Sequence, residues 1–191
     1  MAGKVEKAVR RSFIFIIILL YYCLKMQMEY YVCLMFESIE SYLNSKTIEL
    51  LSQPSHSFCF KARGSMSISL PNVAGVYAIF LEEKMVYVGE SKSLRERWRD
   101  MYDCRNHNFL RIVGNEYLKD MSGFEPATSS RRYSELLTKE LYQYLTDNFS
   151  FKYLPVDLGR KELEEYITNH PEYSATLMNS KGRRGQKGLR I

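Results

Sequence analysis

Two tyrosines, each close to a glycine, stand just ahead of an arginine cluster in the segment 75–100, which reads GVYAIFLEEKMVYVGESKSLRERWRD. A guanidinium can bind two phosphate oxygens at once, and a phenol can orient a phosphate oxygen or a water molecule. If Tyr77, Tyr87 and one of these arginines meet in space, the segment favours chemistry on a phosphodiester.

An ordinary structural interpretation of the same segment stays open at this point. The chain contains 15 tyrosines, so most of them must serve packing. Tyr77 and Tyr87 on neighbouring strands would form a common cross-strand aromatic pair, and several arginines on a short helix would form a common solvated face. Arg97 differs from the other arginines because it borders the helix face that Leu94 and Met101 must bury.

Short strands and helices must position these side chains. Apolar runs predict two strands joined by a turn at 81–84, and a later run that ends near a proline predicts a third. Apolar residues at helical spacing predict four helices, the first capped by Ser91 or Ser93. The expected strands are 76–80, 85–88 and 151–156, and the expected helices are 93–102, 108–121, 131–149 and 159–170. This order, β-β-α-α-α-β-α, predicts an α+β fold in which helices flank a small antiparallel three-stranded sheet.

The motifs resemble those of the GIY-YIG nucleases. Gly75-Val76-Tyr77 matches the first signature of that family, and Tyr87-Val88-Gly89 matches the second at a spacing that the family uses. The continuation YVGESKSLRERW resembles the segment that leads to the family's arginine, which falls on Arg97. The resemblance covers about residues 69–181 and implies a nuclease domain.

The family also has a metal-binding glutamate on the helix after its third strand. The segment FKYLPVDLGRKELEEYI resembles this junction and places the glutamate at Glu164. Helical spacing alone leaves Glu162 open, because both residues flank the buried face, whereas Glu165 points away from it. Glu140 lies on a helix that no strand precedes, so it ranks below these two.

The resemblance implies an endonuclease that hydrolyses DNA phosphodiesters with Mg²⁺, with Mn²⁺ as the alternative ion and no small-molecule cofactor. Tyr77 would orient or deprotonate a water molecule, and Tyr87 would position the phosphate. Arg97 would stabilise the pentavalent state, and Glu164 would hold the metal. Mg²⁺ suits oxygen ligands, and the sequence offers no cluster of soft ligands.

Further residues are candidates for contacts with the nucleic acid. They are motif glycines and nearby polar or basic residues: Gly75, Gly89, Lys92, Arg95, His107 and Asn179. The family often closes its domain with an asparagine, but Ser174 stands at the usual spacing, so Asn179 would need a longer one. The basic tail 181–191 would grip backbone phosphates together with exposed arginines, in line with a net charge of +5. These arginines are Arg95, Arg99, Arg131 and Arg132.

The first 65 residues have no counterpart in the family. We expect an N-terminal helical extension at 1–65, the nuclease domain at 66–180 and the tail at 181–191. The apolar run 13–24 is shorter than the roughly 20 residues that span a membrane. A packed helix, or coding sequence upstream of a later methionine, is favoured over a membrane anchor. The four cysteines form no C-x-x-C pair, which favours reduced thiols in the cytoplasm over a zinc site.

Two other functions stay open. The chain would be a nucleic-acid-binding or accessory module if the same fold had lost catalysis. It would be a membrane-tethered protein if the N-terminal helix were its functional part. The sequence leaves open the recognition site, the choice between DNA and RNA, and the oligomeric state.

Overall fold

The computed structural model describes residues 2–60 and 70–178 and divides the chain into two units, Met1–Asn44 and Ser45–Ile191. We expected the boundary near residue 65. It lies earlier because strand β1, His56–Ser57, joins the sheet of the second unit and Phe58 is buried in its core. Met66, where the new domain was expected to begin, and the tail 181–191 lie outside the described residues.

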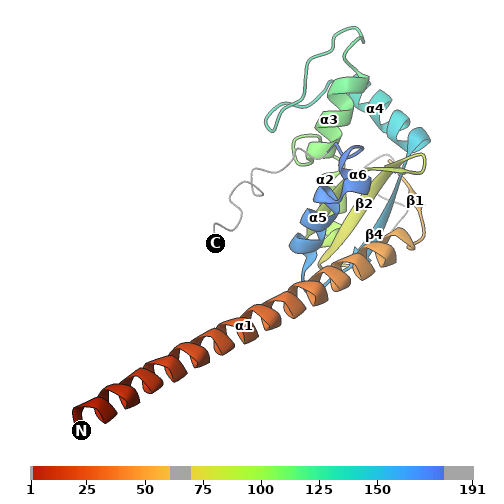
Figure 1. Cartoon of the computed structure of the whole chain (residues 1–191). Helices are drawn as coiled ribbons and strands as arrows, with labels where there is room; N and C mark the ends of the chain where they lie inside the picture. The colour runs from red at the N-terminus through yellow and green to blue at the C-terminus, as the bar shows by residue number, and fades with distance from the viewer. Residues whose placement is uncertain (1, 61–69, 179–191) are drawn as a thin grey trace. The chain divides into compact units, whose positions relative to one another are not determined.

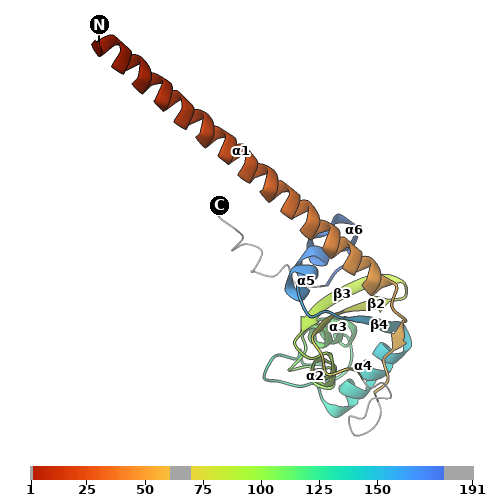
Figure 2. The same cartoon turned by 90° about the horizontal axis from the view of Figure 1, so that it is seen from below.

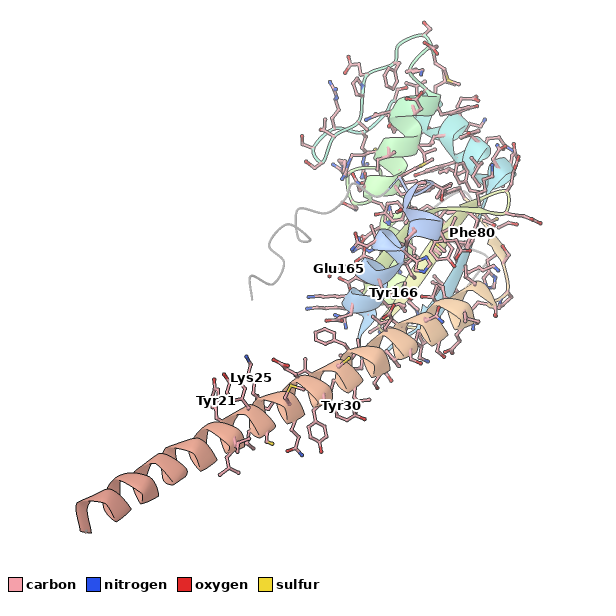
Figure 3. All side chains as sticks on the ribbon, in the orientation of Figure 1. Tyr21, Lys25, Tyr30, Phe80, Glu165 and Tyr166 are labelled. Atoms are coloured by element: carbon pink, nitrogen blue, oxygen red, sulfur yellow. The ribbon has the colours of Figure 1, made fainter. Side chains whose placement is uncertain are left out.

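The first unit is the N-terminal part of α1, a single helix that spans Ala2–Leu51. Large apolar side chains between residues 19 and 42 are exposed, and Figure 3 shows Tyr21, Lys25 and Tyr30 projecting from the helix. Within residues 2–60 and 70–178, no helix is both long enough and apolar enough to cross a membrane. The expected N-terminal helical extension is one continuous helix as far as Leu51.

The second unit is built on a four-stranded antiparallel sheet (Figure 1). The other strands are β2 (Gly75–Leu81), β3 (Lys84–Ser91) and β4 (Phe149–Pro155), and the order across the sheet is β1-β4-β2-β3. The expected α+β class is confirmed, but the sheet has four strands where we expected three. The additional strand β1 is two residues long and lies in the polar stretch SQPSHS, which has no strand pattern.

Five short helices complete the second unit. They are α2 (Leu94–Asp100), α3 (Asn108–Tyr117), α4 (Glu135–Asn148), α5 (Arg160–Asn169) and α6 (Pro171–Ser174). Figure 2 shows α2, α3 and α4 on one side of the sheet, and α5 and α6 on the other. We did not expect α6, which is a single turn that begins at a proline. Helices thus cover both faces of the sheet.

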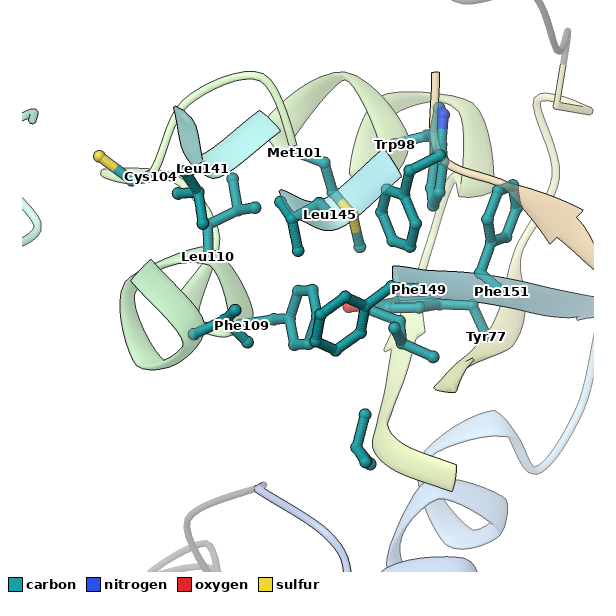
Figure 4. Close-up of a cluster of buried hydrophobic side chains, with 14 of the residues drawn as sticks. Tyr77, Trp98, Met101, Cys104, Phe109, Leu110, Leu141, Leu145, Phe149 and Phe151 are labelled. Carbon is teal, nitrogen blue, oxygen red and sulfur yellow. The ribbon is translucent and has the colours of Figure 1, made fainter. Parts of the chain in front are cut away.

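The core between the sheet and α2–α4 is rich in aromatic side chains (Figure 4). Phe151 of β4 stands opposite Ile79 of β2, and its ring centroid lies 3.7 Å from that of Trp98 on α2. Because side chains alternate along a strand, Tyr77 lies on the same face of β2 as Ile79. The Tyr77 side chain therefore points from the sheet into this core, with only 4% of its surface exposed.

Candidate active site

The two motif glycines make room for buried neighbours. Gly89 of β3 pairs with Tyr77 of β2, and a Cβ atom at Gly89 would lie 2.4 Å from the Tyr77 hydroxyl oxygen. A Cβ atom at Gly75 would lie 2.4 Å from the backbone oxygen of Leu154. Both glycines are buried, and their expected contact with nucleic acid stays a prediction. Their absent side chains are needed for close packing of the sheet and of the Tyr77 ring.

Tyr77 and Tyr87 lie side by side on one face of the β2–β3 hairpin. Their ring centroids are 6.3 Å apart and the ring planes differ by 23°. Tyr77 is buried, whereas Tyr87 is half-buried on the edge strand β3. Burial raises the pKa of both hydroxyls above the usual value of 10.0. Both side chains are therefore neutral phenols at neutral pH.

Arg97 lies on α2, which begins where Ser93 accepts a hydrogen bond from the Glu96 amide. Its charge acts on both tyrosines, because it opposes the burial that raises their pKa values. The guanidinium Nε is buried and has no hydrogen-bond partner within the described part of the chain. Arg97 Nη1 lies 3.6 Å from the Asp100 carboxylate. An unsatisfied guanidinium donor is thus held beside the two phenols.

Glu164 on α5 is half-buried, and its charge also acts on both tyrosines. After burial, it is a further cause of the raised pKa of Tyr87, and it contributes in the same direction to that of Tyr77. The alternatives Glu162 and Glu140 are exposed. Glu165 is exposed as well, as expected for a residue that points away from the buried face (Figure 3). Among the glutamates considered, Glu164 is the one whose charge acts on the hydroxyls of Tyr77 and Tyr87.

His107 has a different place from the one we expected. It immediately precedes α3, is only 1% exposed, and its Nε2 lies 2.8 Å from the Tyr77 hydroxyl oxygen. Burial, together with the charges of Arg97 and Arg111, lowers the pKa of His107 to about 3. A buried, neutral imidazole cannot offer a positive charge to a phosphate. The structure gives His107 a buried partner in Tyr77, and its expected phosphate contact stays a prediction.

Arg111 of α3 is a residue that the sequence did not single out. Its Nη1 donates to the backbone oxygens of Cys104 and Arg105, at 2.9 and 2.7 Å. These bonds hold the loop that ends at His107, and the charge of Arg111 opposes the raised pKa of Tyr87. In the sequence, Arg111 is simply one basic residue on a predicted helix. Its two shorter hydrogen bonds go to backbone atoms, and only the third, from Nη2 to the Asn108 side chain at 3.3 Å, joins two side chains.

An ion pair that sequence analysis did not predict joins α5 to β3. Arg160 Nε donates to the Glu90 carboxylate at 2.7 Å, and both side chains are about one-fifth exposed, at 20% and 19%. Glu90 follows Gly89 directly, and Arg160 is the first residue of the helix that carries Glu164. The pair therefore fixes the start of α5 against the strand that carries Tyr87. The two residues lie far apart in the sequence, which hides this contact.

The remaining candidates lie at the surface or outside the described residues. Lys92 and Arg95 are exposed, and Arg95 Nε donates to the backbone oxygen of Leu70 at 2.9 Å. Arg131 pairs with Glu125, and Arg132 pairs with Asp103. The exposed Arg99 lies on α2 with Arg97. Asn179 and the basic tail lie outside the described residues.

The donor set at this site suits a hard metal ion that keeps most of its water. In the described part of the chain, no three His, Cys, Asp or Glu side chains gather in a way that could hold a metal ion. Mg²⁺ is commonly bound by one or two carboxylates, with water and substrate phosphate oxygens completing its shell. A single carboxylate, Glu164, beside two phenols fits that mode. It does not fit a closed site made of protein ligands alone.

The arrangement brings together a guanidinium, a carboxylate and two phenols, with a neutral imidazole behind one of them. These groups can bind an anion, hold a cation and direct a water molecule. In comparisons with known proteins, the chain matched no family model, no curated protein and no solved structure. The resemblance to the GIY-YIG nucleases therefore rests on the sequence motifs alone.

Proposed function

We propose that the chain is an endonuclease of the GIY-YIG type that hydrolyses DNA phosphodiesters with Mg²⁺. One observation carries the proposal: the charges of Arg97 and Glu164 both act on the hydroxyls of Tyr77 and Tyr87. These residues come from α2, α5, β2 and β3, and only the fold brings them together. Ordinary packing of a tyrosine pair would need neither charge.

Each residue has a chemical role that its environment supports. The unsatisfied Nε of Arg97, with the neighbouring Nη atoms, can donate to two phosphate oxygens and offset charge in the pentavalent state. Tyr87 is half-buried and can donate a hydrogen bond to the same phosphate. Tyr77 lies deeper and can accept a hydrogen bond from the attacking water. Glu164 would hold Mg²⁺, which when bound supplies charge stabilisation for the phosphoryl and leaving oxygens.

Exposed basic residues near α2 support a polyanionic substrate. Lys92 precedes the helix, and Arg95 and Arg99 lie on it with solvent-exposed side chains. Arg97, by contrast, is only partly exposed, and the net charge of the chain is +5. Contacts of exposed lysine and arginine with backbone phosphates are independent of sequence and sensitive to salt. We therefore expect the exposed residues to contribute affinity and Arg97 to contribute to the chemical step.

A nicking assay on supercoiled plasmid with Mg²⁺ tests the proposal. We expect the wild type to convert the plasmid to open circles, and Arg97→Ala and Glu164→Ala to lose at least about 100-fold in rate. Lys139→Ala removes one positive charge from the exposed face of α4, and Glu165→Ala removes one carboxylate from α5, so both are matched controls. Both controls should cleave at the wild-type rate.

The same assay separates the proposal from its main alternative. If the wild type bound DNA with a steep salt dependence but did not nick it, the chain would be a nucleic-acid-binding module. If Arg97→Ala nicked as fast as the wild type, the assignment of the site would be wrong. Equal losses in Glu164→Ala and Glu165→Ala would indicate damage to α5 rather than loss of a site residue.

A further inference from the structure

The Tyr77 hydroxyl has one close partner whose role the proposed reaction does not yet include. Tyr77 Oη and His107 Nε2 are 2.8 Å apart, and both residues are buried, at 4% and 1% exposure. His107 occupies the N-cap position of α3, yet its side chain makes no capping hydrogen bond. Its Nδ1 atom is also buried and has no partner in residues 2–60 and 70–178. The hydrogen bond to Tyr77 is thus the polar contact that orients this imidazole.

The direction of the hydrogen bond depends on the tautomer of the imidazole. Burial raises the pKa of Tyr77 well above 10.0, while burial and two nearby arginines lower that of His107 to about 3. At neutral pH the phenol is therefore protonated and the imidazole is neutral. The inference requires the tautomer in which Nδ1 carries the ring proton, so that the Tyr77 hydroxyl donates to Nε2. A phenol in this state cannot take a proton from water unless it gives up its own.

We propose that His107 accepts the hydroxyl proton of Tyr77 while Tyr77 takes a proton from the attacking water. The water proton moves to Tyr77 Oη, the former Tyr77 proton moves to His107 Nε2, and the resulting hydroxide oxygen bonds to phosphorus. The bond from phosphorus to the leaving oxygen breaks with its electron pair, and that oxygen is protonated by solvent. The imidazolium returns its proton to solvent after product release. His107 acts through Tyr77 and is a positioning residue, and this inference rests on the proposed function.

The charged groups around the pair explain when the transfer occurs. Arg97 on α2 and Arg111 on α3 disfavour an imidazolium, while Tyr87 on β3 and Glu164 on α5 face Tyr77. A bound phosphate brings negative charge to Arg97 and weakens its effect on His107. Proton transfer to His107 thus costs less free energy with the substrate in place than in the free protein. In the free protein the imidazole stays neutral.

The pH dependence of cleavage by His107→Ala tests the inference. At neutral pH we expect a 10²–10⁴-fold loss of rate, the usual contribution of general acid–base catalysis. The remaining rate should rise about tenfold per pH unit, because without the acceptor Tyr77 must first ionise to the phenolate. Wild type should lack this rise near neutral pH, and added imidazole should restore part of the rate of the variant. His170 lies outside the site and caps α6 with its side chain, a role that asparagine can also fill. The control variant His170→Asn should therefore match the wild type.

Two results would overturn the inference while leaving the proposed function in place. One is a His107→Ala variant with the wild-type rate, and the other is a slow variant whose pH dependence is that of the wild type. If the wild type itself fails to cleave, the proposed function is wrong, and the inference is wrong with it.

A nitrogen NMR measurement on the wild type does not depend on whether a variant folds. It should show a protonated Nδ1 and an Nε2 that accepts a hydrogen bond, with the Nε2 shift changing in Tyr77→Phe. A protonated Nε2 in the wild type would also overturn the inference.

Discussion

Adding one methyl group at Gly89 should disturb both stability and the candidate site. The new Cβ atom would lie 2.4 Å from Tyr77 Oη and 2.5 Å from its Cζ, whereas ordinary contacts begin near 3.4 Å. The ring tip would have to retreat by about 1 Å in a core where Tyr77 is 4% exposed. A shift of that size breaks the 2.8 Å hydrogen bond to His107.

The expected cost of Gly89→Ala follows from these two effects. Overpacking of a buried site costs about 1–3 kcal/mol, and a lost buried hydrogen bond adds about 1 kcal/mol. The sum, roughly 2–4 kcal/mol, corresponds to a fall in melting temperature of about 4–16 °C for a domain near 150 residues. A misplacement of about 1 Å at a catalytic group can also cost on the order of 100-fold in rate. Urea unfolding gives the free energy, and the nicking assay gives the rate.

A double-mutant cycle with Tyr77→Leu tests whether the Tyr77 ring is the cause. Leucine lacks the Cε, Cζ and hydroxyl atoms that a Cβ atom at Gly89 would meet. In the Tyr77→Leu background, Gly89→Ala should therefore cost less than 1 kcal/mol, which corresponds to a coupling energy of about 1–3 kcal/mol. An equal cost in both backgrounds would refute the packing role of Gly89. A backbone effect of the substitution would then be the cause.

Two further predictions concern stability. Glu82, in the two-residue turn between Leu81 and Lys84, has φ 57°, so Glu82→Gly should relieve left-handed strain and raise the free energy of unfolding by about 0.5–1 kcal/mol. A lower urea midpoint in Glu82→Gly would contradict this. The pKa of His107, about 3 when folded against 6.5 ordinarily, means that the unfolded chain binds the extra proton between these pH values. Stability should therefore fall by up to about 1.4 kcal/mol per pH unit as the pH drops from 6.5 towards 3. His107→Asn should reduce that slope, and an unchanged slope would mean that folded His107 binds the proton as readily as the unfolded chain does.

Sequence patterns sufficed for the elements that local chemistry determines. Apolar runs and a short turn predicted β2 and β3, because a hairpin pairs neighbouring segments. Ser93, one of the two predicted caps, starts α2, since a cap bonds an amide three residues later. The helices were found for the same reason, although α3 and α4 are shorter than their predicted ranges. In each case the interacting groups are close in the chain.

The sequence did not locate partners that are distant in the chain. The strand β1 exists because two residues of a polar stretch pair with β4, which follows much later. The Glu90–Arg160 ion pair and the contact between Tyr77 and His107 are likewise long-range. Burial, together with the charges of Arg97 and Arg111, makes His107 a neutral partner of Tyr77. Such environments arise only when separate elements pack together.

By itself, the sequence determined the two tyrosine–glycine strands, the arginine helix after them and the list of glutamates that can join them. The residues of each motif are close together in the chain, so their spacing can be read without knowing the fold. Only the tertiary structure decided that Glu164 reaches the tyrosines and that Gly89 makes room for Tyr77. It also decided that His107 lies behind the Tyr77 hydroxyl. The physical reason is that charge and steric exclusion act over a few ångströms in space, whatever the separation along the chain.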